Sequence, residues 1–149
     1  MTSRIYRPVL AAAAILALSA PAWADGPEYL NFVERATSDA VLDTGAKGDS
    51  AGDILTFANE IYDEANKTKM GDDNGWCIRT VAGKAWECFW TLTIAEGQIT
   101  VEGPFLDGKD SVLAVTGGTG EYSSARGDMQ LHARNPEGTE YDFKYNLTE

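Results

Sequence analysis

The stretch that decides the fold is Trp76–Ile94, which reads WCIRTVAGKAWECFWTLTI. It contains two runs rich in β-branched and aromatic residues, Trp76–Val81 and Trp86–Ile94, with Ala82-Gly83 between them. Extended runs on either side of a short segment with a glycine predict a β-hairpin. We therefore expect two antiparallel strands joined by a two-residue turn.

This turn sets the register of the hairpin. Val81 then pairs with Lys84, and Cys77 lies directly opposite Cys88. Opposed cysteines in an exported protein are expected to form a disulfide, since the compartment is oxidising. One face of the hairpin carries Cys77, Arg79, Trp86, Cys88, Trp90 and Leu92, whereas the other carries Trp76, Ile78 and Phe89. Both faces are apolar, so the alternation alone does not decide which one is interior.

Export is predicted by the first 24 residues. Arg4 and Arg7 precede the apolar run Val9–Leu18, and a small-residue cleavage pattern ends at Ala24. These are the three parts of a secretory signal peptide, and the apolar run is too short to span a bilayer. We expect residues 1–24 to be removed and residues 25–149 to form one domain that is secreted or periplasmic.

The expected mature chain is strongly acidic. The leader holds two of the 12 Lys+Arg and none of the 23 Asp+Glu, so its removal changes the formal net charge from −11 to −13. This charge argues against binding to nucleic acid, and the composition argues against membrane insertion.

The rest of the chain repeats the pattern of short extended runs separated by Gly, Asp and Asn. We predict eight strands at Tyr29–Ala36, Asp53–Tyr62, Trp76–Val81, Trp86–Ile94, Gln98–Phe105, Ser111–Thr116, Ala125–Ala133 and Glu140–Leu147. Turn chemistry is expected at Asp72–Gly75 and at Thr116–Gly120, and Thr37–Gly52 is expected to be a mobile loop. Eight short strands predict an all-β antiparallel sandwich or up-and-down barrel.

Two polar residues interrupt apolar faces and are therefore candidates for function. Asn59 follows Leu55 and Phe57 on one face of its strand, and Glu34 follows Phe32 on one face of the first. Asn59 is either a structural amide bonded to backbone or a group that orients a ligand. Glu34 is either an acid or base with a raised pKa in an apolar lumen, or a rim residue paired with an arginine such as the adjacent Arg35.

The remaining motifs are weaker indications of function. The single histidine, His132, and two bonded cysteines leave no zinc set, and Asp72-Asp73-Asn74 lacks the length of a calcium loop. We expect no metal site and no cofactor.

Three segments resemble the plant allene oxide cyclases. Gly52–Asp63 is similar to their second-strand block, Gly75–Ile78 to the Gly-x-Cys strand that follows, and Gln98–Phe105 with Leu113–Gly120 to their most recognisable run. The continuation Gly120–Gly127 is closer to the dirigent proteins, which share the barrel.

The resemblance extends from about Tyr29 to Leu147. It implies an eight-stranded antiparallel up-and-down barrel with an elongated apolar lumen, commonly assembled as a homotrimer.

The resemblance also suggests a site. Asn59 takes the position of the family's Asn that binds a water molecule in contact with the epoxide oxygen of the substrate. Cys77 matches the family's lumen cysteine, which implies that the face with Cys77 and Trp90 points inward. Glu34 takes the position of the first-strand Glu, although Ala36 stands where the family has an Asn. In an alternative alignment Asn31 takes the Glu position. The candidate catalytic residues are thus Asn59 and Glu34, and the candidate ligand-binding residues are Leu55, Phe57, Cys77 and Trp90.

Two functional hypotheses follow. In the first, the barrel is a cofactor-independent cyclase or isomerase that confines a small hydrophobic substrate. In the second, it binds or carries a hydrophobic ligand without turnover. A lumen filled by Trp86 and Trp90 would instead indicate a structural protein.

Overall fold

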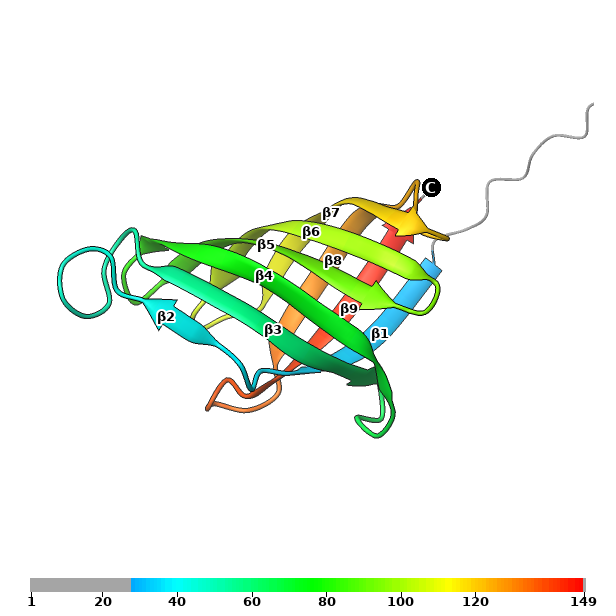
Figure 1. Cartoon of the computed structure of the whole chain (residues 1–149), viewed down its shortest axis with the longest axis horizontal. Coiled ribbons are helices and arrows are strands. Elements are labelled where there is room, and N and C mark those ends of the chain that lie inside the picture. Colours follow the sequence, from blue (N-terminus) through cyan, green and yellow to red (C-terminus); the bar gives the residue numbers. More distant parts are fainter. Residues whose placement is uncertain (1–27, 149) are drawn as a thin grey trace, which may run out of the picture.

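The computed structural model describes residues 28–148, so the predicted signal peptide lies outside the described residues. The described chain is all β-structure (Figure 1). Its nine strands are β1 (Glu28–Arg35), β2 (Ala40–Leu42), β3 (Ile54–Asp63), β4 (Lys69–Val81), β5 (Ala85–Ile94), β6 (Gly97–Leu106), β7 (Ser111–Gly120), β8 (Arg126–Ala133) and β9 (Glu140–Thr148). Within this part of the chain, no helix could cross a membrane.

Eight of these strands form a closed barrel. Strands β3 to β9 each pair antiparallel with the next, β9 pairs with β1, and β1 pairs with β3 to complete the ring. Closure removes the exposed edges that an open sheet would offer to other chains. The predicted eight-stranded antiparallel barrel is confirmed, and the sandwich alternative is wrong.

The ninth strand, β2, lies on the same edge of β3 as β1. Strand β1 pairs with the second half of β3 and β2 with the first half, so the link 36–39 interrupts what would otherwise be one long strand. Residues 37–52 were predicted as a loop throughout and instead contain β2. The loop that follows is held by the buried carboxylate of Asp53, which accepts hydrogen bonds from backbone N–H groups of Thr44, Gly45 and Ser50.

The barrel interior is filled by the alternate residues of each strand. Apolar side chains that face inward from all eight barrel strands form one core, including Phe32, Ile61, Leu92, Ile99, Val101, Leu113, Met129 and Phe143. This follows from the period-2 geometry of strands, in which every second side chain points to the same face.

The hairpin β4–β5 has the predicted pairing at its centre. Cys77 pairs with Cys88 and the two form a disulfide, as predicted. The cysteine face is interior, whereas Trp76 and Ile78 on the opposite face are exposed. The predicted two-residue turn is wrong: Val81 pairs with Ala85, three residues form the turn, and a bulge near Thr80 takes up the extra residue.

Two glycine-rich segments were wrongly predicted as turns. Asp72–Gly75 lies inside β4, which begins at Lys69 and pairs along its length with both β3 and β5. Thr116–Gly120 is the end of β7 and pairs with β6 from Gly117 onward. In both cases tertiary pairing on two sides outweighs the local preference of Asp, Asn and Gly for turns.

Candidate functional site

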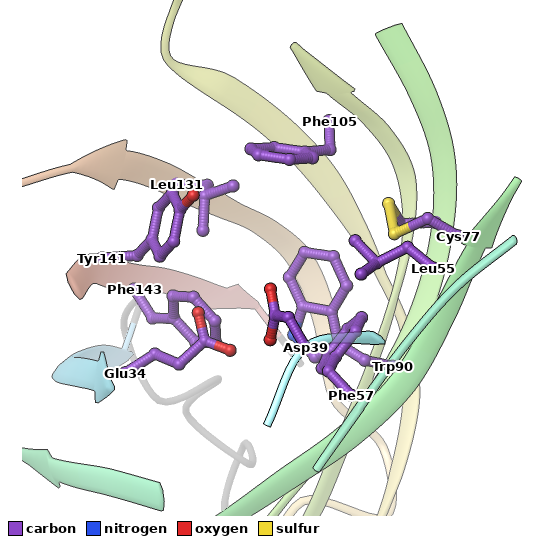
Figure 2. A pocket seen from close by; sticks show the side chains of 11 residues that line it. Glu34, Asp39, Leu55, Phe57, Cys77, Trp90, Phe105, Leu131, Tyr141 and Phe143 are labelled. Atoms are coloured by element: carbon purple, nitrogen blue, oxygen red, sulfur yellow. A yellow bond between two sulfur atoms is a disulfide. The ribbon is translucent and has the colours of Figure 1, made fainter. Parts of the chain in front are cut away.

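A cavity opens inside the barrel toward the end at which β1 ends and β9 begins. Its volume is about 40 Å³, and the Cys77–Cys88 disulfide forms part of its wall. Figure 2 shows aromatic rings around it and two carboxylates facing it. The lining residues are Glu34, Asp39, Leu55, Phe57, Cys77, Cys88, Trp90, Phe105, Leu131, Tyr141 and Phe143. The four predicted ligand-binding residues, Leu55, Phe57, Cys77 and Trp90, are all among them.

The aromatic wall depends on a glycine. Gly75 in β4 pairs with Phe57 on one side and with Trp90 on the other. Because Gly75 has no side chain, the two rings meet across β4 in an edge-to-face contact with centroids 6.0 Å apart. Trp90 also packs against Phe143, at 5.6 Å. These rings fix the shape of the cavity.

A second pair of rings separates the cavity from a larger cleft. Phe105 and Tyr141 contact each other edge to face at 5.9 Å and line both spaces. The outer cleft has a volume of about 410 Å³ and lies between the β6–β7 and β8–β9 turns. The inner cavity has room for a few water molecules, whereas ligand pockets usually measure several hundred Å³. A larger molecule therefore requires the wall of the inner cavity to move, and Phe105 and Tyr141 belong to the part of this wall that faces the outer cleft.

Asn59 lies beneath the cavity, and protein groups use all of its hydrogen-bonding capacity. Its Oδ1 accepts hydrogen bonds from the backbone N–H groups of Thr37 and Ser38 and from Ser38 Oγ, each at 3.0 Å. Its Nδ2 donates to Glu34 Oε1 and to Asp39 Oδ1, each at 2.8 Å. The side chain thus takes the place of the sheet pairing that is missing between β1 and β2.

This amide determines where two carboxylates lie. Glu34 ends the inward face of β1, and Asp39 lies on the link to β2, so Asn59 holds together groups from two segments. Of the two alignments suggested for the first strand, only Glu34 faces the cavity, because Asn31 is exposed.

The expected ion pair of Glu34 is not formed. The neighbouring Arg35 lies over the Tyr62 ring at 3.6 Å and donates hydrogen bonds to Asn66. Glu34 itself is buried, which leaves the interpretation of an acid in an apolar lumen.

A third carboxylate, Asp73, completes the cluster. It points inward from β4, is fully buried, and accepts a hydrogen bond from the Asn59 backbone N–H through Oδ1. Its Oδ2 has no donor among the described groups when both acids are ionised. A proton held by Glu34 would supply one, because the two acids lie close enough for each to shift the pKa of the other.

The ionisation of this pair is strongly perturbed. Burial, followed by the negative charge of Asp73, raises the pKa of Glu34 well above its ordinary value, while the hydrogen bond from Asn59 opposes the shift. Burial likewise raises the pKa of Asp73 to about 7, against hydrogen bonds from the Asn59 backbone and from Glu34. Two acids that share one site cannot both ionise easily, so each carboxylate opposes the ionisation of the other.

Two further buried polar atoms lie in this region. Tyr145 Oη and Trp90 Nε1 have no partner that meets hydrogen-bond geometry among the described residues. Burial raises the pKa of Tyr145, with a further contribution from the charge of Asp73, so its hydroxyl stays protonated. At the mouth, burial and then the charge of Glu34 raise the pKa of Tyr141 to about 12.

Sequence reasoning missed Asp73 and Asp39. Asp73 was assigned to a turn because it lies in Asp72-Asp73-Asn74-Gly75, and its alternation with Gly75 and Cys77 was the signal that could have placed it inside. Asp39 lies in the segment expected to be a loop and carries no pattern.

Across residues 28–148, no three His, Cys, Asp or Glu side chains are arranged to hold a metal ion.

The fold and site define a class: small closed β-barrels with an aromatic-lined cavity and buried acids at its base. The family model described as allene oxide cyclase matches residues 28–143. The chain therefore belongs to the allene oxide cyclase family.

Solved structures of the same fold include three named for enzymes. A pyocyanin demethylase is 24% identical, with a TM-score of 0.68 over 81% of this chain and 100% of that one. An exo-specific intermolecular Diels-Alderase is 14% identical, with a TM-score of 0.67 over 84% and 100%. A pterocarpan synthase dirigent protein is 13% identical, with a TM-score of 0.66 over 84% and 95%. At these identities the likeness shows the fold.

We predict that Asn59→Leu lowers the free energy of unfolding by roughly 3 kcal/mol or more, because the buried Glu34 and several partly buried polar groups lose their partner. Urea unfolding measures this loss. Asn74→Leu is the matched control, since Asn74 lies on the exposed face of the adjacent strand and should change stability by less than about 0.5 kcal/mol. Equal losses in the two variants would contradict the structural role of the amide.

Asp73→Asn should change how stability depends on pH. In wild type the folded state keeps a proton on Asp73 between its ordinary pKa of 3.8 and its folded pKa of about 7. The unfolded state releases that proton, so this group makes stability fall as pH rises through the window.

The asparagine variant keeps the hydrogen bond from Asn59 and does not titrate. It should gain roughly 2 kcal/mol relative to wild type between about pH 5 and about pH 8, measured by urea unfolding. Asp72→Asn, on the exposed face, is the control. Parallel pH profiles for wild type and Asp73→Asn would refute the raised pKa.

Proposed function

We propose that this protein is an exported, cofactor-independent cyclase or isomerase that confines a small hydrophobic molecule at the aromatic cavity and moves a proton through Glu34. The observation that carries the proposal is a buried, proton-bearing carboxyl at the wall of an apolar cavity. A carboxyl whose pKa is raised by burial is suited to general acid–base catalysis, because it keeps a proton that an ordinary glutamate would have released.

The neighbours of Glu34 support this role. Asn59 donates a hydrogen bond to Glu34 Oε1 and so stabilises the carboxylate that remains after proton release. Asp73 lies behind Glu34 and shares its proton. One acid can therefore release and recover a proton within a single turnover, and the reaction needs no external cofactor.

Confinement supplies the second part of the mechanism. The rings of Phe57, Trp90 and Phe143 restrict the shape of a bound molecule. Holding a flexible substrate in one reactive conformer can lower a barrier by several kcal/mol. Family membership and the enzyme names of the structural relatives support this interpretation.

The alternative is a binding or carrier barrel without turnover. It is favoured by the disulfide, which removes Cys77 as a reactive thiol, and by Asn59, whose hydrogen bonds all go to the protein. The interior packing of Trp86 and Trp90 and the small cavity point toward a structural role unless the Phe105–Tyr141 pair opens.

The proposal also includes the compartment and the oligomeric state of the protein. The protein is secreted or periplasmic, as the predicted leader suggests, and the disulfide fits an oxidising compartment. It assembles as a homotrimer through its apolar outer surface, to which Leu42, Trp76 and Ile78 contribute exposed side chains.

The test incubates mature protein with a lipophilic extract of its source, followed by native mass spectrometry and chromatography of the released molecules. Cyclisation and isomerisation leave mass unchanged, so we expect a released molecule with the same mass and a shifted retention time. Glu34→Gln should lose at least about 100-fold in conversion, whereas Glu87→Gln, on the exposed face of β5, should match wild type.

Each other outcome has a defined meaning. Release with unchanged retention establishes the carrier, and an empty barrel leaves the structural role. Full conversion by Glu34→Gln would show that proton transfer does not pass through this residue. The same spectrum reports whether three subunits assemble.

A further inference from the structure

The three carboxylates around Asn59 have no cationic partner. Lysine, arginine and histidine side chains of the described chain form ion pairs with Asp49, Glu60, Asp72, Asp107, Asp110 and Asp142. None of these pairs includes Glu34, Asp39 or Asp73. The charges of Asp73 and Asp39 that act on Glu34 are both negative, so the cluster lacks compensation within the described protein.

Two of these carboxylates face the cavity. Glu34 and Asp39 accept hydrogen bonds from the same Asn59 nitrogen, at 2.8 Å each, so their head groups lie close together. Figure 2 shows both carboxylates directed into the space between the rings. Even with one proton shared between Glu34 and Asp73, the three carboxyl groups keep a net negative charge, so the opening presents negative potential to an incoming molecule.

The rest of the cavity wall also favours a positively charged ligand. Five aromatic residues line the cavity: Phe57, Trp90, Phe105, Tyr141 and Phe143. The faces of aromatic rings attract cations, and aromatic cages with nearby carboxylates are a common means of binding quaternary nitrogen.

From this combination we infer that the ligand of the cavity is an aromatic or otherwise apolar molecule that carries a positively charged nitrogen. The rings hold the apolar body, and Glu34 and Asp39 face the charged nitrogen. The inference rests on the proposed function, since it names the ligand class of the same cavity.

A neutral or anionic ligand fits the observations less well. A neutral hydrocarbon leaves the two carboxylates facing an apolar surface, which is unfavourable for charged groups. An anion meets like charges from Glu34 and Asp39. A metal ion has no suitable set of three donors in the described residues. An organic cation satisfies the carboxylates and the rings together.

The experiment compares three probes of closely similar shape by isothermal titration calorimetry: N-methylquinolinium, neutral 1-methylnaphthalene and anionic 1-naphthoate. We expect the cation to bind at least about tenfold more tightly than either of the other two. High salt should reduce the part of this preference that comes from the exposed Asp39 and leave the part that comes from the buried Glu34.

Variants assign the preference to the cavity. Glu34→Gln should weaken binding of the cation at least about tenfold and leave the neutral probe within about twofold. Asp39→Asn, on the exposed link, provides a second variant if Glu34→Gln fails to fold. Glu87→Gln removes one surface charge and should change neither affinity.

The outcomes separate this inference from the proposed function. If the neutral or anionic probe binds as tightly as the cation, the inference is overturned and the apolar cavity stands. If cation binding is unaffected in both Glu34→Gln and Asp39→Asn, the cation binds elsewhere and the inference fails. If none of the three probes binds, both the inference and ligand binding at the cavity are contradicted.

Discussion

The interaction on which the site depends is the set of hydrogen bonds made by one buried amide, Asn59. Its oxygen holds the link between β1 and β2, and its nitrogen holds Glu34 and Asp39. Backbone pairing cannot hold this link, because the strand on that edge of β3 is interrupted between β1 and β2. A single polar side chain therefore closes the barrel wall and places two acids at the cavity.

One shared proton would explain how Glu34 and Asp73 can be buried side by side. Asp73 needs a donor for its second oxygen and Glu34 is too buried to ionise easily, so one proton between them satisfies both. The rings of Phe57 and Trp90, brought into contact over Gly75, form the apolar wall of the cavity that Glu34 faces. The proposed acid–base chemistry and the proposed recognition of a cation both start from these buried acids beside the cavity.

Much of the fold could be predicted from the sequence because strand alternation is a local signal. Two cysteines in opposed runs were enough to fix the centre of the β4–β5 hairpin, and the breaks in apolar alternation at Asn59 and Glu34 marked both as interior. Asp73 was missed because its neighbours have the composition of a turn, and only pairing with strands on both sides keeps them extended. Strand β2 was missed because three exposed residues carry no pattern.

The most direct test of the account is the infrared spectrum of the protein at neutral pH in the region of the protonated carboxylic acid carbonyl. The account predicts a carbonyl band from a buried protonated carboxyl in wild type, lost in Glu34→Gln and unchanged in Glu87→Gln. It also predicts that Asp73→Asn shifts this band, because the proton then loses its carboxylate partner. A spectrum without any protonated carboxyl at neutral pH would contradict the shared proton, and with it the chemistry assigned to the site.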